Sequence, residues 1–364
     1  MLATTLACAS STCTLRHKND SMSDRPPIKL EPLKSIDIET CSDVVDVLIS
    51  MSRASFGGRQ IGEAWRVLRK IADDPHCALV LTVSGAMSIA KLGRIFGSFI
   101  ANSIVRAVIT TGAVVTHSLI EECGMCHYKA PRNLTDTDLY NLKLNRIYDS
   151  IEPESNLEKL EILARKTFSM MVSKGCYGSF DIIRLVSSGL LNRKKKTGFL
   201  GSALKYGVNV YVPALSDSEL GLYLFRYVKY SRGSNQNHIV YDPFRDLSEY
   251  SRWLCSQKHV AFLTLGGGVP RNWAQQMLPF LKAQQEAGEL TSNARLPKIV
   301  AAIRICPDPA ELGHLSGSTY SEGITWGKLD PEKKENFVEV CCDATIVFPV
   351  LAKLLLDYIK QKEK

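Results

Sequence analysis

The sequence predicts an α/β fold in which a doubly wound, mainly parallel, Rossmann-like sheet has helices on both faces. Three observations support this prediction. Apolar runs rich in β-branched residues, such as CALVLTVSG (77–85), end at glycine and are typical of buried parallel strands. Segments with helical spacing of apolar residues lie between these runs. The alternation of strand and helix continues to the end of the chain, which is the pattern of a parallel sheet.

The elements follow from these patterns in chain order. Buried apolar runs predict strands within 77–85, 105–114, 208–215, 260–270, 298–308 and 338–345. Amphipathic spacing predicts helices within 44–53, 62–74, 90–104, 114–123, 157–172, 248–259, 271–285 and 346–362. Residues 130–150 are expected to form a polar connection. Residues 309–328 are Gly/Ser-rich and irregular, which is typical of functional loops.

The domain organisation is predicted to be simple. Residues 1–38 are polar and contain prolines, so we expect a flexible N-terminal leader. Residues 39–364 show no repeat and no clear linker, and we expect a single domain. Translation could start at Met1 or at Met22.

Composition and charge favour a cytoplasmic globular protein. The 364 residues include 45 Lys and Arg against 37 Asp and Glu, a net charge of +8. The basic residues do not alternate with aromatic ones in one patch, so we expect no nucleic-acid partner. No apolar run approaches the ~20 residues that span a bilayer, and the first residues lack the basic start of a signal peptide. Eleven cysteines at irregular spacing suit reduced thiols.

The stretch CGMCHYK (123–129) spells C-x-x-C-H, which is the spacing of a haem attachment site. Covalent haem belongs to exported proteins, and a zinc site would need a further Cys or His pair. A redox or metal role for Cys123 and Cys126 stays open, but a structural role is favoured. We therefore expect no metal site here, and we expect Gly124 to end the preceding helix.

Small and acidic residues at the predicted strand ends indicate a nucleotide site. The sequences VSGAMS, TTGAV, TLGGGV and CCDAT follow four strands, although G-x-G-x-x-G is absent. In the irregular segment, Glu322, Trp326 and Lys328 lie close together in sequence. A lysine that is desolvated beside an aromatic ring can lose its proton and become a nucleophile, whereas an exposed lysine is the simpler interpretation.

Four stretches give the chain a family resemblance. VPALSDSELG, LGGGVPRN, EGITWGK and CCDATIVFPVL together resemble the deoxyhypusine synthase family, from about residue 40 to the end. The resemblance implies a Rossmann-like fold and a homotetramer with sites between subunits. It also implies that NAD oxidises spermidine and that a lysine in the WGK motif holds the aminobutyl group as an imine. The group then passes to a lysine of a translation initiation factor.

The resemblance assigns roles by motif. Lys328 matches the imine-forming lysine and is the expected catalytic residue. The expected NAD contacts are Ser84, Gly85, Ala86, Met87, Ser88, Thr111, Gly112, Ala113, Asp217, Gly267, Asp343 and Ala344. The expected substrate contacts are Glu322, Trp326, His117, Asn272, Gly313 and His314.

The polyamine half of the family pattern is altered. Where the family has an acidic pair after TTGAV, this chain has Thr116 and His117. Further polyamine-binding positions hold Leu222, Asn272 and Leu315, so among the expected acids Glu322 remains. Because a polycation needs carboxylates, the chain resembles the deoxyhypusine synthase-like branch with a changed amine substrate.

Several functions stay open on this basis. The favoured one is an NAD-dependent aminoalkyl transferase that acts on a small amine or polyamine, and a protein acceptor is uncertain. A homospermidine-synthase-like enzyme with a diamine acceptor is one alternative. A non-catalytic NAD-binding oligomer partner and a simple NAD-dependent amine oxidoreductase are the others.

Overall fold

The computed structural model describes residues 13–15, 28–171, 175–191, 198–231, 239–290 and 295–362. The chain divides into two compact units, residues 1–62 and 63–364. In the first unit, β1 (Cys13–Leu15) pairs antiparallel with β2 (Ile28–Leu30), and η1 (Ile38–Thr40) and α1 (Val44–Ser52) follow. Most of the predicted leader, residues 1–38, lies outside the described residues, so its flexibility stays a prediction.

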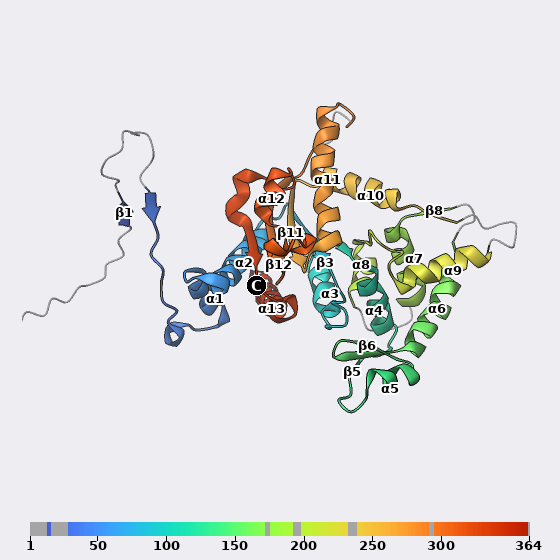
Figure 1. The fold of residues 1–364 in the computed structure, drawn as a ribbon. Coiled ribbons are helices and arrows are strands. Elements are labelled where there is room, and N and C mark those ends of the chain that lie inside the picture. The colour runs from blue at the N-terminus through green and yellow to red at the C-terminus, as the bar shows by residue number, and fades with distance from the viewer. Residues whose placement is uncertain are drawn as a thin grey trace, which may run out of the picture. The chain divides into compact units, whose positions relative to one another are not determined.

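Six parallel strands form the central sheet of the second unit (Figure 1). Their spatial order is β13, β12, β11, β3, β4, β9, and every neighbouring pair is parallel. Numbered along the chain, this is the order 3-2-1-4-5-6 of Rossmann-type domains. The predicted doubly wound sheet is therefore confirmed, and its switch point lies between β3 and β11. The strands are β3 (Cys77–Val83), β4 (Val105–Thr110), β9 (Asn209–Tyr211), β11 (His259–Leu265), β12 (Lys298–Ile305) and β13 (Phe337–Val340).

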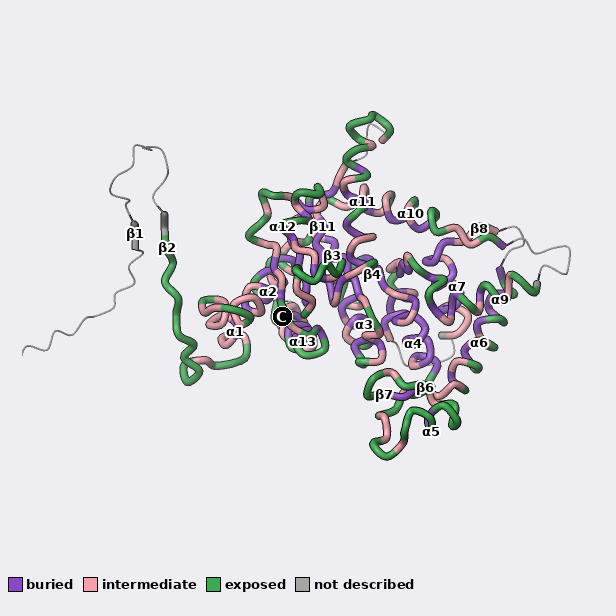
Figure 2. The backbone as a smooth tube through the Cα atoms, viewed as in Figure 1, coloured by how far each residue is buried: buried purple, intermediate pink, exposed green. Residues whose placement is uncertain are grey.

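Helices pack on the sheet because its strands are apolar on both sides, as Figure 2 shows by their burial. α10 (Pro243–Cys255) and α11 (Gly268–Glu286) share a buried cluster with strand residues, which includes Tyr250, Met277 and Phe262. α3 (Gly93–Ala101) and α13 (Ala344–Lys362) contact β4 and β12, and their Phe96 and Phe348 rings lie 5.9 Å apart. The two halves of the sheet progress in opposite directions, so right-handed crossovers place their helices on opposite faces.

The polar connection expected at residues 130–150 is folded instead. It contains α5 (Asp136–Asn141) and the middle strand in chain order, β6, of a small antiparallel sheet of order β5-β7-β6, whose other strands flank the segment (Figure 1). The strands are β5 (Tyr128–Lys129), β6 (Leu144–Ile147) and β7 (Ser150–Pro153). They are too short to show an alternating apolar pattern, and the two buried residues of β7 are one apolar and one acidic residue, Ile151 and Glu152. Thr135 and Asp138 form a capping box that begins α5.

Besides α5, the described α-helices that were not predicted are α7 (Ser179–Leu191), α8 (Phe199–Tyr206), α9 (Glu219–Ser231) and the short α12 (Tyr320–Thr325), which lies in the segment expected to be irregular. The remaining elements are α2 (Phe56–Asp73), α4 (Gly112–Glu122), α6 (Glu154–Phe168), β8 (Cys176–Tyr177), β10 (Val240–Tyr241), η2 (Ala310–Leu312), η3 (Leu315–Gly317) and η4 (Pro331–Asn336). Among the described residues, no helix combines the length and the apolar character that crossing a membrane requires.

The C-x-x-C-H stretch begins at the end of α4. Gly124 has a φ of 86°, and its N–H donates to the carbonyl of Glu121 over 2.9 Å. The N–H of Met125 donates to the carbonyl of Ile120 over 3.0 Å, which completes a Schellman motif. The predicted helix end at Gly124 is confirmed. Cys123 is buried, whereas Cys126 is exposed.

Candidate active site

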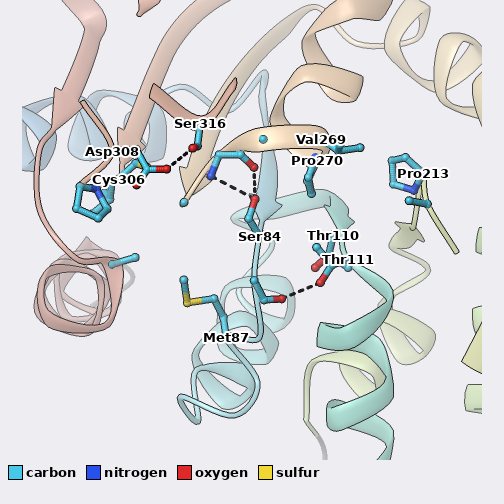
Figure 3. Close-up of a pocket in the computed structure, with 18 of the residues that line it drawn as sticks. Ser84, Met87, Thr110, Thr111, Pro213, Val269, Pro270, Cys306, Asp308 and Ser316 are labelled. Carbon is cyan, nitrogen blue, oxygen red and sulfur yellow. Dashed lines mark hydrogen bonds between the residues drawn. The ribbon is translucent and has the colours of Figure 1, made fainter. Parts of the chain in front are cut away.

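The carboxyl ends of neighbouring strands surround a cavity of about 480 Å³ (Figure 3). It extends across the switch point between β3 and β11, which is where open parallel sheets bind ligands. Its lining comes from the segments that follow each of the six strands. These residues are Ser84, Gly85, Met87, Thr110, Thr111, Gly112, Pro213, Ala214, Asp217, Gly266, Gly267, Gly268, Val269, Pro270, Ile305, Cys306, Pro307, Asp308, Ser316, Asp343 and Ala344.

Most of the predicted NAD contacts meet in this cavity. Nine of the twelve line it, namely Ser84, Gly85, Met87, Thr111, Gly112, Asp217, Gly267, Asp343 and Ala344. Ala86, Ser88 and Ala113 are not part of the lining. Ser88 is only 1% exposed, because its side chain turns into the protein.

Two glycines let the backbone turns around the cavity approach each other closely. A Cβ on Gly112 would lie 2.3 Å from the side chain of Ser218. A Cβ on Gly267 would lie 2.5 Å from the Cα of Ser316. The hydroxyl of Ser84 bonds to both the N–H and the carbonyl of Gly267 and so joins the turns after β3 and β11 (Figure 3). Larger residues at either glycine would push these turns apart.

The polar groups of the cavity suit a dinucleotide. α4, α11 and α13 all begin at the cavity, and helix N-termini favour phosphate groups. Thr111 caps α4 by accepting from the N–H of Val114 over 3.2 Å. The carboxylates of Asp217, Asp308 and Asp343 also face the cavity, and carboxylates bind ribose hydroxyls. The residues present therefore fit NAD.

Lys328 lies outside this cavity, next to α11. Its Nζ donates to the Oδ1 of Asn272 over 2.8 Å and lies 5.6 Å from the ring centroid of Trp326. Partial burial lowers the pKa of the Lys328 ammonium, the positive charge of Arg271 lowers it further, and Glu322 opposes both. A lowered pKa leaves more of the amine neutral and nucleophilic at a given pH. Lys328, Trp326 and Asn272 are thus brought together, as the sequence predicted.

Glu322 and Trp326 only partly match their expected roles. Glu322 forms a capping box with Thr319 at the start of α12, and its Oε1 lies 3.2 Å from the backbone nitrogen of Thr319. Trp326 ends that helix with 66% of its surface exposed. The dry aromatic wall predicted beside Lys328 is therefore incomplete within one chain.

Two buried arginines fix the irregular segment before Lys328. Arg271 of α11 donates to the carbonyl oxygens of Leu315 and Ser318 over 2.7 and 2.8 Å. Arg304 of β12 donates to the carbonyl of Ser318 over 3.1 Å and pairs with Glu339 at 2.7 Å. These bonds hold a segment with little regular structure against the sheet.

Gly313 and His314 lie in this segment, between η2 and η3. Gly313 ends η2 with a φ of 70°. The Nδ1 of His314 is 4.0 Å from the Oδ2 of Asp308, and the His314 side chain is 59% exposed. His314 is thus placed beside an acid of the cavity, but it does not line the cavity itself.

A second cavity of about 640 Å³ lies on the other side of the first turn of α11. Val269 lines both cavities, and Asn272, the partner of Lys328, lines the second one. The second cavity is lined by Phe244, Leu247, Ser248, Ser251, Val269, Asn272, Trp273, Gln276, Met277, Phe280 and Gln284. This lining is aromatic and uncharged, whereas the first cavity has three carboxylates.

His117 does not line either cavity. It is 7% exposed on α4, and its Nδ1 lies 3.2 Å from His127 and 3.4 Å from Glu152. It points toward the small antiparallel sheet because it lies more than one turn along α4 from Gly112, the residue at the cavity. The position that corresponds to an acid of the family thus has local partners of its own.

Several lining residues were missed from the sequence. Asp308 and Ser316 come from the segment after β12, and their side chains hydrogen-bond to each other (Figure 3). The ending ICPD on a buried strand was a signal for Asp308, because acids at strand ends face this crevice. Pro213 and Val269 had no such signal, since apolar side chains occur throughout the core.

Comparisons with known proteins show which proteins the chain is similar to. The family model for deoxyhypusine synthase matches residues 46–355. The chain is 28% identical over 314 residues to a probable deoxyhypusine synthase 2 of Archaeoglobus fulgidus, which covers 86% of this chain and 98% of that protein. It is 28% identical over 330 residues to a deoxyhypusine synthase-like protein of Chlorobaculum parvum, with 88% of each chain covered. A crystal structure of a candidate deoxyhypusine synthase from Entamoeba histolytica is similar in fold, with a TM-score of 0.54, 13% identity and coverage of 88% of this chain and 96% of that one.

Proposed function

The chain belongs to the deoxyhypusine synthase family, and from this premise we propose that it is an NAD-dependent aminoalkyl transferase that works through an imine on Lys328. The observation that supports this most is the position of Lys328. Its Nζ is half-buried, lies over Trp326 and bonds to Asn272, on the helix whose first turn separates the two cavities.

The first cavity is the proposed NAD site. Gly85, Gly112 and Gly267 line this cavity with backbone alone, and Asp217 and Asp343 are the proposed acceptors for ribose hydroxyls. When bound, NAD would supply the redox chemistry of this reaction, which is the removal and the return of a hydride.

Lys328 supplies the covalent step. Its neutral amine attacks the C=N carbon of the oxidised donor, the new C–N bond forms, and the leaving amine departs with a proton. The acceptor amine then attacks the same carbon and releases Lys328 with its proton restored. The lowered pKa of Lys328 supports the first attack, because only the unprotonated amine has a free electron pair. Asn272 keeps Nζ in place by accepting its hydrogen bond.

We propose that the substrates are not the standard pair of the family, in which spermidine is the donor and an initiation factor is the acceptor. The positions that the family pattern fills with acids hold Thr116, His117, Leu222 and Leu315 here. The second cavity, next to Lys328, has aromatic and amide side chains in its lining. Such a lining suits an amine with fewer positive charges, since each buried ammonium needs a partner.

A homotetramer with sites between subunits completes the proposal. Trp326, Phe280 and Phe244 lie near Lys328 or line the second cavity, and each is more than half exposed. A second copy over this surface would supply the missing part of the dry wall. Large exposed aromatic side chains in one region are typical of subunit contacts. A cytoplasmic location belongs to the same proposal.

A non-catalytic NAD-binding partner of a related subunit is the second candidate. The replaced acids favour it, because a subunit that no longer binds spermidine needs none of them. In that case Lys328 would form no imine with any amine.

Trapping the imine separates these functions. The protein is incubated with NAD and a panel of amines that includes spermidine, putrescine, cadaverine and agmatine, and borohydride is then added. We expect an adduct whose mass identifies the donated group and which maps to Lys328. The variant Lys328→Arg should give none, and Lys334→Arg, at an exposed lysine of η4, should react as the wild type does.

The outcomes decide between the candidates. An adduct with spermidine as strong as with any other amine would overturn the changed substrate. NADH formation without an adduct would indicate a simple amine oxidoreductase. NAD binding without either would favour the non-catalytic partner.

A further inference from the structure

A buried cluster of two histidines and one carboxylate lies away from both cavities of the active site. It consists of His117 on α4, His127 in the segment before β5, and Glu152 on β7. Their side chains are only 9%, 2% and 1% exposed. A third cavity, of about 440 Å³, adjoins the cluster at His127. The proposed transferase chemistry makes no use of this group.

The potential ligand atoms already converge. The Nδ1 of His117 and the Nε2 of His127 are 3.2 Å apart. The Oε2 of Glu152 lies 3.4 Å from the first nitrogen and 2.5 Å from the second. In a tetrahedral zinc site with bonds of about 2.0–2.2 Å, the ligand atoms lie roughly 3.3–3.5 Å apart. Two of the three separations therefore match already, and the third needs to open by somewhat less than about 1 Å.

Glu152 gives a second, independent indication of a bound cation. Its Oε2 is buried, and the polar atoms beside it are the two imidazole nitrogens of the cluster. Its Oε1 accepts from the Nδ2 of Asn156 over 2.7 Å, and the same amide group donates to the carbonyl of Cys126 over 3.0 Å. Asn156 thus fixes the carboxylate with Oε2 turned toward the histidines. A buried carboxylate needs positive charge beside it, and either a proton on an imidazole nitrogen or a metal ion shared by all three groups can supply that charge.

One neighbour opposes metal binding in the arrangement observed. The Nζ of Lys91 lies 3.0 Å from the Nδ1 of His127. When an ammonium donates to Nδ1, the ring proton is on Nε2, and that nitrogen cannot bind a metal. Metal binding therefore requires Lys91 to turn away, and Glu121 offers it a carboxylate at 3.6 Å.

We propose that His117, His127 and Glu152 form a binding site for a divalent transition-metal ion of the zinc class. Two imidazoles and one carboxylate are ligands that zinc accepts, and water would complete the coordination. The ligands come from α4 and from the small antiparallel sheet, so the ion would tie that sheet to α4. Asn156 is the positioning residue of the carboxylate. The sequence led to an expectation of no metal site because no second Cys or His pair accompanies C-x-x-C-H. The proposed ligands do not depend on such a pair, and Cys126 is not one of them.

The test is metal binding by the full chain after a chelator has removed bound metal. Zn²⁺ is titrated calorimetrically, and Co²⁺ is added separately so that its visible absorption reports the geometry. We expect one strong site per chain, intense tetrahedral Co²⁺ bands and a rise in melting temperature with Zn²⁺. Glu152→Gln preserves the shape of the side chain and should weaken binding at least ~100-fold, since loss of a ligand exceeds the effect of an outer-shell change.

Three further variants make the test specific. Lys91→Met removes the competing ammonium and should tighten Zn²⁺ binding several-fold, which a purely structural hydrogen-bonded cluster would not do. His259→Asn removes a histidine that pairs with Asp74 elsewhere in the structure and should leave the site unchanged. Cys126→Ser should also leave the Zn²⁺ affinity unchanged.

Several results would overturn the proposal. They are the absence of tetrahedral Co²⁺ bands in the wild type, equal Zn²⁺ affinity in Glu152→Gln, and loss of the site in Cys126→Ser. If Glu152→Gln does not fold, the Co²⁺ spectrum and the Lys91→Met affinity decide the question. None of these results changes the test of Lys328, because NAD binding and imine trapping are measured at a different site.

Discussion

The close contact between Gly112 and Ser218 predicts that Gly112→Ala disturbs both stability and cofactor binding. The new Cβ would lie 2.3 Å from the Cβ and the Oγ of Ser218, whereas ordinary contact begins near 3.4 Å. The turns after β4 and β9 would therefore have to separate by about 1.1 Å. Overpacking of this kind costs about 1–3 kcal/mol in the free energy of unfolding.

The same displacement should weaken NAD binding. Thr111, Gly112 and Asp217 line the cavity on both sides of this contact. A shift of about 1 Å in positioning groups can lower the rate of a bound reaction by about 100-fold. We expect at least a tenfold loss of NAD affinity by calorimetry and a lower denaturation midpoint in urea at a fixed protein concentration.

A double variant tests the reasoning directly. In Gly112→Ala with Ser218→Gly, both clashing atoms are gone and the nearest remaining atom, the Cα of residue 218, lies at 3.6 Å. Ser218→Gly alone loses the hydrogen bonds to the carbonyl of Leu215 and from the N–H of Gly221, at roughly 1 kcal/mol each. The two changes should therefore combine to less than the sum of their separate costs. Additive losses, or a Gly112→Ala protein that matches the wild type in both assays, would refute the steric argument.

Three further predictions concern single side chains. Burial raises the pKa of Glu122 to about 7, although the N–H groups of Leu200 and Gly201 bond to its carboxylate. The stability that the protonated side chain contributes is therefore fully present below about pH 4.5 and is lost as the pH rises through about 7. The free energy of unfolding, measured with urea, should fall by up to about 3 kcal/mol between pH 5 and 8, and the fall should be smaller in Glu122→Gln. The same fall in both proteins would contradict this prediction. Asp343→Asn keeps an acceptor for the N–H of Thr345, so the free energy of unfolding should stay within about 0.5 kcal/mol of the wild type. The same variant should bind NAD about tenfold more weakly. If the loss of stability is as large as the loss of NAD binding free energy, Asp343 has only a structural role. Glu322→Gln retains the capping box but removes a charge that raises the pKa of Lys328, so pH-dependent acetylation of Lys328 should titrate at lower pH than in the wild type.

The central sheet was predictable because long buried strands have a strong local signal. The runs at 77–85 and 260–270 are mostly apolar with glycine at or near their ends, and both contain strands of the central sheet. The strands β5, β6 and β7 of the small sheet have only two to four residues each, so no alternating period could appear in the sequence. Short helices such as α8 were not predicted for a similar reason. Eight residues form only about two helical turns, which is too few to show a clear helical period in the sequence.

The site was predicted unevenly for a related reason. Motif residues such as Gly112 and Asp343 are fixed by their positions at strand ends, and the strand order brings those ends together. The role of His117 could not be found this way, because its partners His127 and Glu152 are set by the packing of the small sheet on α4. Contacts between distant segments of this kind depend on tertiary structure rather than on local spacing.

The first turn of α11 is a shared wall between two chambers, and this has a consequence for evolution. Residues 268–270 line the first cavity, and Val269 also reaches the second. Asn272, Gln276, Phe280 and Gln284 repeat every four residues along the second cavity. Substitutions along this second stripe can reshape the cavity beside Lys328 while the turn that lines the proposed NAD cavity stays intact. Under the proposed function, a lineage could therefore exchange one amine for another by changing one helical stripe, without altering its cofactor cavity.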